Sequence, residues 1–415
     1  MSMSENYKRA RVGCYMLGAS MAATVNLSPI LFLTFHTLYG ISYSLLGLLV
    51  LVNFFTQLIV DLLFSIFSHK FNISLSVKLT PLLAVFGLVI YSLSPFIFPQ
   101  HEFFGIISGT VIFSVAGGLS EVLTSPTIAA IPSENPEREM SRLHSTYAWG
   151  TVGVVTVSTL FILAFGKEYW WVLALVFAVL PLIAAFNLLP SEIPELQTAK
   201  STSGKANQKY SGIPILFLAI FLGGAAECTM SQWSSSYIEE ALGINKTVGD
   251  IFGVALFAIM LGLGRTLYSK YGRNIFRVLI FGSLGAFICY ITAAMSSFSW
   301  IGLVACALVG IFTSMLWPGT LIVAEKRFCG AGVFVFALMA AGGDLGASLV
   351  PQLVGVITDR IASLDALAPL AASFGITRES LGMRCGMLAA SLFPLAAVFV
   401  FLYISKIMKE RESNT

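Results

Sequence analysis

Long, unbroken apolar runs constrain this chain more than any other feature of its sequence. Twelve such runs can be recognised, each at least about 18 residues long, and about 20 apolar residues suffice for a helix to cross a bilayer. A backbone in lipid must bond its own polar groups, so runs of this kind predict membrane-spanning α-helices. They also argue against a β-barrel, whose strands alternate apolar and polar residues.

The runs fall into two groups of six on either side of a polar segment. The first six predicted spans are Cys14–Phe35, Tyr43–Phe67, Val77–Phe98, Phe103–Ile131, Ser141–Phe165 and Tyr169–Leu189. The second six are Ile213–Tyr237, Asp250–Tyr268, Phe276–Met295, Ile301–Ala324, Ala331–Ile357 and Leu381–Ile407. We therefore predict an all-α integral membrane protein with twelve transmembrane helices in two parallel six-helix halves, 1–189 and 211–415, joined by a linker at 190–210. Transporters built from two parallel halves bind substrate between them, near the bilayer midplane.

The composition supports a membrane protein and excludes several other classes. Only 11% of the residues are charged, against roughly 25% in soluble proteins. The net charge of +3 gives no reason to expect a nucleic-acid partner. The six cysteines show neither CxxC nor Cys/His spacing, so we expect no metal site, no cofactor and no disulfide framework. No nucleophile with a positioned base can be recognised, and an enzyme is not expected.

The distribution of positive charge predicts the orientation. Most of the 24 Lys and Arg residues fall in the termini, the linker and the loops on one side of the predicted topology. Positive loops are retained in the cytoplasm, so both termini and the linker are expected there. We expect a monomer in the bilayer of the plasma or bacterial inner membrane.

Ionisable side chains within the apolar runs are the first candidates for function. Glu121, Glu227 and Asp344 lie near the middle of their spans, and Asp61 lies in the inner half of the second span. A charge at the bilayer centre costs about 2.5 to 3.5 kcal/mol even on a lenient scale. These carboxyl groups are therefore expected to face a wet cavity or to be protonated.

Other polar residues lie on the same helix faces as these carboxyl groups and form polar stripes with them. Asn53, Gln57 and Asp61 are spaced i, i+4 and i+8, and so are Asp344, Ser348 and Gln352. Two further stripes are Ser114, Gly118, Glu121 and Ser125 in the fourth span, and Glu227, Ser231 and Ser234 in the seventh. The stripes predict one shared polar cavity. The alternative is that some of these side chains only join helices, at about 0.6 kcal/mol each.

Aromatic and amide groups near the stripes favour a sugar as the substrate. A sugar has apolar C–H faces that stack on rings and hydroxyl edges that bond amides and carboxylates. Gln232, Trp233, Trp317 and Tyr147 supply such groups, although packing or an interfacial position would also explain the aromatic residues. Arg265, with Lys270 and Arg273, is expected to mark the membrane interface.

Four stretches narrow the prediction to a family. They are AECTMSQWSSSY at 226–237, LGLGRTLYSKYGR at 261–273, SMLWPG at 314–319 and AAGGDLGASLVPQLVG at 340–355. The chain resembles the major facilitator superfamily, and these stretches resemble its fucose permease and glucose/galactose-proton symporter branch. The loop between the second and third spans departs from the superfamily pattern, because His69 stands where an Asp is usual.

The resemblance implies proton-coupled sugar transport by alternating access. It places a proton-coupling carboxylate at Glu121, whereas the first-span Asp of that branch is replaced here by Asn26. Either Glu121 acts alone, or Glu227 or Asp344 joins it. The candidate substrate-binding residues are Asn26, Asn53, Gln57, Glu121, Tyr147, Glu227, Gln232, Trp233, Trp317, Asp344 and Gln352.

Three alternatives to this function remain open. The protein could be a facilitator, an exporter of an amphipathic compound, or a nutrient receptor that does not transport. The tails 1–11 and 406–415 are too short for a signalling domain, which argues against the receptor.

Overall fold

A computed structural model describes residues 7–67, 70–133, 136–194, 212–271, 274–327 and 333–412. These residues form helices and no strand, which confirms the predicted all-α class. His69 and most of the predicted linker 190–210 lie outside the described residues.

The helices divide into two compact units. Unit 1 comprises Met1–Ile41 and Val52–Ser201, and unit 2 comprises Ser42–Leu51 and Thr202–Thr415. Helix α4 (Tyr43–Phe67) contributes to both, since its first turns belong to unit 2 and the remainder to unit 1.

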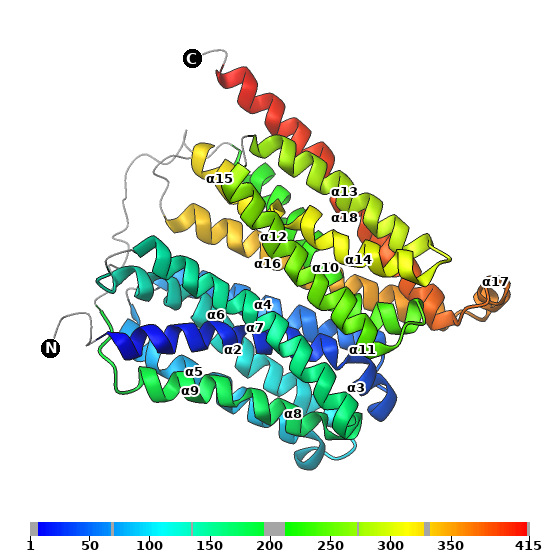
Figure 1. Ribbon diagram of the computed structural model, residues 1–415, viewed down its shortest axis with the longest axis horizontal. Helices are drawn as coiled ribbons and strands as arrows, with labels where there is room; N and C mark the ends of the chain where they lie inside the picture. The colour runs from blue at the N-terminus through cyan, green and yellow to red at the C-terminus, as the bar shows by residue number, and fades with distance from the viewer. Residues whose placement is uncertain are drawn as a thin grey trace. The chain divides into compact units, whose positions relative to one another are not determined.

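Unit 1 is a bundle of helices drawn from blue to green in Figure 1. Besides α4 it contains α2 (Lys8–Ile30), α3 (Phe32–Tyr39), α5 (Ile73–Ile97), α6 (Glu102–Ala130), α7 (Pro136–Phe165), α8 (Trp170–Phe177) and α9 (Val179–Leu188). Helix α5 packs along α6, and α2 packs along α7. The short 3-10 segment η2 (Lys167–Tyr169) leads into α8.

Apart from Ser42–Leu51, unit 2 is a second bundle, drawn from green to red in Figure 1. Its long helices are α10 (Ile213–Ser236), α12 (Leu256–Tyr271), α13 (Ile275–Met295), α14 (Ser299–Thr313), α15 (Leu316–Arg327), α16 (Val333–Ala362) and α18 (Arg378–Glu412). Its shorter elements are the π-helical η3 (Tyr237–Ala241), α11 (Lys246–Gly249), the π-helical η4 (Asp250–Ala255), η5 (Asp365–Leu367) and α17 (Ala368–Ser373).

Ten helical segments in the described residues are long and apolar enough to cross a membrane, and the bent pair α2 and α3 makes eleven. All of them overlap predicted spans. The predicted span Ser141–Phe165 corresponds to a shorter apolar segment, Trp149–Phe165, because α7 begins with a charged turn.

The bend in the first span follows from a proline. Pro29 lacks a backbone N–H and crowds the carbonyl one turn earlier, so a helix cannot pass through it undisturbed. Helix α2 ends at Ile30 and α3 starts at Phe32, at an angle of 46°.

Glycines allow close helix contacts within each unit. In unit 1, a Cβ at Gly109 of α6 would lie 2.5 Å from the Tyr91 nitrogen of α5. In unit 2, a Cβ at Gly224 of α10 would lie 2.4 Å from the Gly343 oxygen of α16. Small residues let membrane helices approach each other in this way.

Candidate functional site

Asn53, Gln57 and Ser114 join α4 to α6 in unit 1. The Ser114 hydroxyl donates to Asn53 Oδ1 at 2.7 Å, and Gln57 Nε2 donates to the same oxygen at 2.9 Å. All three side chains are buried. The predicted spacing of i and i+4 therefore produces a closed hydrogen-bonded cluster, in which the amide of Gln57 also packs over Gly117.

Two carboxyl groups come together one to two turns further along the same helices. Asp61 of α4 is 4% exposed, and its Oδ1 has no hydrogen-bond partner among the described residues. Glu121 of α6 is exposed, and its carboxyl oxygen lies within 4.8 Å of that of Asp61. Glu121 continues the α6 face of Ser114 and Gly118.

Asn26 of α2 contacts α7. Its Nδ2 donates to the Ala22 carbonyl at 2.8 Å and to Thr151 Oγ1 at 3.5 Å. Thr151 in turn donates to the carbonyl of the half-buried Tyr147. Asn26 and Tyr147 thus belong to one contact between helices of unit 1.

Glu227 of unit 2 is paired with Arg265. Arg265 Nη2 donates to both carboxylate oxygens of Glu227, at 3.1 and 3.4 Å, and Arg265 Nε donates to the Ser314 carbonyl at 3.1 Å. The Glu227 side chain is 13% exposed and that of Arg265 is 45% exposed. The expectation that Arg265 only marks the membrane interface missed this pair.

Gln232 and Trp233, the next candidates on α10, are buried in the helix packing. Trp233 Nε1 donates to the Pro351 carbonyl of α16 at 2.9 Å, and its ring contacts Tyr43 at the start of α4. Gln232 Oε1 has no hydrogen-bond partner among the described residues.

Trp317 on α15 and Gln352 on α16, two of the candidate substrate-binding residues, pack against glycines of neighbouring helices. The Trp317 ring covers Gly343, where a Cβ would lie 2.3 Å from it. Asp344 follows Gly343 and is buried. Gln352 is half-buried beside Gly47 of α4, a residue that belongs to unit 2.

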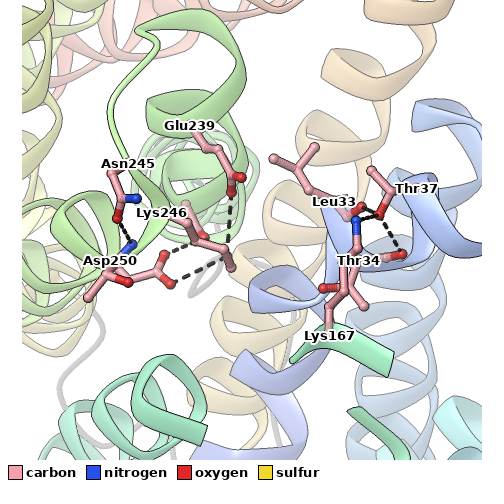
Figure 2. A network of polar contacts seen from close by, with 10 residues as sticks. Leu33, Thr34, Thr37, Lys167, Glu239, Asn245, Lys246 and Asp250 are labelled. Carbon is pink, nitrogen blue, oxygen red and sulfur yellow. Dashed lines mark hydrogen bonds and ion pairs between the residues drawn. The ribbon is translucent and has the colours of Figure 1, made fainter. Parts of the chain in front are cut away.

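Two polar networks that the sequence analysis did not select are drawn in Figure 2. In unit 2, Lys246 lies 3.3 Å from the fully buried Asp250 and 4.0 Å from Glu239, which places this network between η3 and η4. In unit 1, Lys167 Nζ donates to Thr37 Oγ1 at 3.1 Å. Asp250 stands at the start of the predicted span Asp250–Tyr268. An acidic residue at that position could have pointed to this network from the sequence.

A further buried acid, Glu139, lies at the start of α7. It accepts hydrogen bonds from the Tyr15 hydroxyl and from Arg142 Nη1, the latter at 2.9 Å, and Arg11 Nε lies 3.5 Å away. The Tyr15 hydrogen bond and the nearby guanidinium groups hold the pKa of Glu139 below its ordinary value, although burial acts in the opposite direction. Glu139 falls outside the predicted spans, which is why the search for charges within them passed over it.

The helical spans, with charged side chains held inside each unit, define a polytopic membrane protein. The chain belongs to the major facilitator superfamily, whose family model matches residues 13–351.

Solved structures with the same fold include several transporters. A D-xylose-proton symporter aligns with a TM-score of 0.71 at 15% identity, over 93% of this chain and 96% of the other. A nucleoside transporter aligns with a TM-score of 0.66 at 14% identity, over 98% and 100%. The fucose:proton symporter of E. coli aligns with a TM-score of 0.56 at 14% identity, over 94% and 99%. No curated protein sequence matches the chain.

Proposed function

We propose that this transporter moves a small polar solute, a monosaccharide or similar polyol, together with protons. Alternating access would be a movement of two halves, residues 1–189 and 211–415, with the linker and both termini in the cytoplasm and one chain as the working unit. The observation that carries the proposal is the approach of Asp61 to Glu121 in unit 1.

Proton coupling is supported by the different surroundings of these two carboxyl groups. Asp61 is buried without a hydrogen-bond partner among the described residues, whereas Glu121 on the neighbouring helix is exposed. Two negative charges at this separation repel each other strongly in a low dielectric, and one proton on the pair removes that repulsion. Glu121, the exposed member of the pair, would be the group that exchanges this proton. Glu227 and Asp344 remain the competing positions.

A polyol as substrate is supported by the polar groups that carry hydrogen-bonding capacity within each unit. The amides, carboxyl groups and indoles named above are the groups that bond or stack on sugars. Two of the similar structures are sugar-proton symporters, and their low identity restricts that support to the shared fold.

The decisive experiment is transport by the purified protein in proteoliposomes. A panel of radiolabelled hexoses and pentoses is offered with an inward proton gradient, and accumulation above the external concentration is measured with and without a protonophore. We expect at least one sugar to accumulate, and the protonophore to abolish the accumulation.

The alternatives predict other outcomes. Equilibration that is insensitive to the protonophore would identify a facilitator, and efflux alone would identify an exporter. Binding without any flux would identify a receptor.

A further inference from the structure

Arg265 lies at one edge of the exposed surface of α12, away from the apolar side chains of that surface. Ile259, Leu263 and Leu267 repeat at i, i+4 and i+8 and are all exposed, as lipid-facing residues are. Ala258, Gly262 and Arg265 repeat at i, i+4 and i+7 along a different line of the same helix. Arg265 therefore faces its partner on α10 instead of the lipid.

There is open space on the same side of α12, one turn before Arg265. A Cβ added at Gly262, one turn before Arg265, would meet no atom within 4 Å. By contrast, a Cβ at Gly264, on the packed side of the helix, would lie 2.2 Å from the Ser314 hydroxyl. The empty side of α12 is the side on which Arg265 is exposed.

The Glu227–Arg265 pair leaves hydrogen-bonding capacity unused. Arg265 uses Nη2 and Nε for Glu227 and Ser314, and Nη1 has no partner among the described residues. A carboxylate offers about four acceptor positions, of which Arg265 occupies one on each oxygen of Glu227. A donor and an acceptor thus stand side by side, in an orientation fixed by the planar guanidinium.

The charges around the pair favour a neutral ligand. Glu227 already neutralises Arg265 in the ion pair. An anionic solute would therefore meet no net positive charge at the pair and would have to compete with Glu227 for the guanidinium, whereas a neutral solute can bond to both groups without separating them.

We infer that Glu227 and Arg265 together recognise two adjacent hydroxyl groups of a neutral solute. Arg265 Nη1 donates to one hydroxyl oxygen, and the Glu227 carboxylate accepts from the neighbouring O–H. The ligand class is then a vicinal diol on an uncharged ring, and Arg265 is a specificity-determining residue. This inference deepens the proposed function and rests on it.

The experiment measures sugar binding to the purified full-length protein by titration calorimetry. Neutral hexoses and pentoses, the matching uronic acids, and each monodeoxy analogue of the best-bound sugar are compared. The variants are Arg265→Lys, which keeps the positive charge but removes the planar guanidinium, and Glu227→Gln, which removes the negative charge. Arg277→Lys is the matched control, because Arg277 is exposed at the first turn of α13. Thermal unfolding of every variant verifies that it is folded.

We expect Arg265→Lys to weaken binding of the parent sugar by about tenfold, whereas Arg277→Lys leaves it unchanged. One monodeoxy analogue should bind with equal affinity to wild type and to Arg265→Lys, because it lacks the hydroxyl that Arg265 recognises. Glu227→Gln should show the same pattern with the analogue that lacks the adjacent hydroxyl.

Three results would overturn the inference. If Arg265→Lys or Glu227→Gln lowers the affinity for the parent sugar and for every analogue by the same factor, the residue has a purely structural role. If a uronic acid binds more tightly than the neutral sugar and loses this advantage in Arg265→Lys, the pair is an anion site. Sugar binding unaffected by either substitution would overturn this inference while leaving the proposed function intact. Failure of wild type to bind any neutral sugar would overturn both.

Discussion

The carboxylate of Asp359 caps the amino end of helix α4. Its oxygens accept hydrogen bonds from the backbone N–H of Tyr43 at 3.0 Å and of Ser44 at 2.6 Å, across more than 300 residues of sequence. The first turns of α4 belong to unit 2 with Asp359, whereas the rest of α4 belongs to unit 1. A negative charge on the unsatisfied N–H groups of a helix start is favourable.

Replacement of Asp359 by Ala should therefore loosen the start of α4. A lost amino-terminal cap costs about 0.5 to 2 kcal/mol, so we expect a lower thermal midpoint and faster hydrogen exchange in the first turn of α4. Asp365→Ala is the control, because among the described residues the Asp365 side chain forms only an exposed ion pair, with Arg378. Unchanged exchange at Tyr43 and Ser44 would refute the cap.

The contact between Tyr15 and Glu139 should make stability depend on pH in a defined direction. The pKa of Glu139 is held below its ordinary value of 4.5, so the charged form is stabilised by folding. That contribution is complete above pH 4.5 and is lost as the pH falls through the folded-state pKa. Tyr15→Phe should lower the stability at pH 7 by about 1.5 to 3 kcal/mol, the net value of a hydrogen bond to a charged group.

Thermal unfolding in detergent, at pH 7 and in a series below pH 4.5, measures this effect. Tyr271→Phe is the control, since Tyr271 is exposed at the end of α12. If the Tyr15→Phe variant and wild type differ by the same amount at every pH, the tyrosine does not act through the Glu139 charge.

Glu121→Gln should separate transport from proton coupling. The substitution keeps the shape of the side chain and removes its titration, so exchange of solute across proteoliposomes should survive while accumulation driven by a pH gradient is lost. Glu227→Gln and Asp344→Asn test the competing positions in the same assay. Glu192→Gln, at an exposed position after α9, is the control. Accumulation at the wild-type level in all three variants would exclude proton coupling through these sites.

Asn53→Ala tests whether the α4–α6 cluster serves packing or binding. The substitution leaves Gln57 and Ser114 without their shared acceptor, and we expect about 0.6 kcal/mol for each lost bond within the membrane. Asn187→Ala is the control, since in the described part of the chain the Asn187 side chain bonds only the Ile183 carbonyl of its own helix. A loss of solute binding without any fall in the thermal midpoint would instead place Asn53 in the binding site.

The predicted orientation can be tested at two exposed glutamates. A cysteine at position 192, just after α9, should react with an impermeant maleimide only from the cytoplasmic side. A cysteine at position 168, just before α8, should react only from outside. The chain without an added cysteine gives the background from the native thiols, and the opposite pattern would reverse the topology.

The sequence determined the helices because lipid leaves a backbone few alternatives. A long apolar run must satisfy its own N–H and C=O groups, so the spans could be predicted from hydropathy. Spacing also predicted that Asn53 and Gln57 share a helix face, because the helical repeat fixes positions four residues apart.

The tertiary structure decided which partner each polar side chain meets. Glu227 and Arg265 are 38 residues apart, and Asp359 and Tyr43 are 316 apart, so no local spacing relates them. Their contacts depend on how each helix is rotated and how closely the glycines let it approach its neighbour. Rotation and approach follow from the packing of many small contacts over the whole bundle, which a pattern within one helix does not contain.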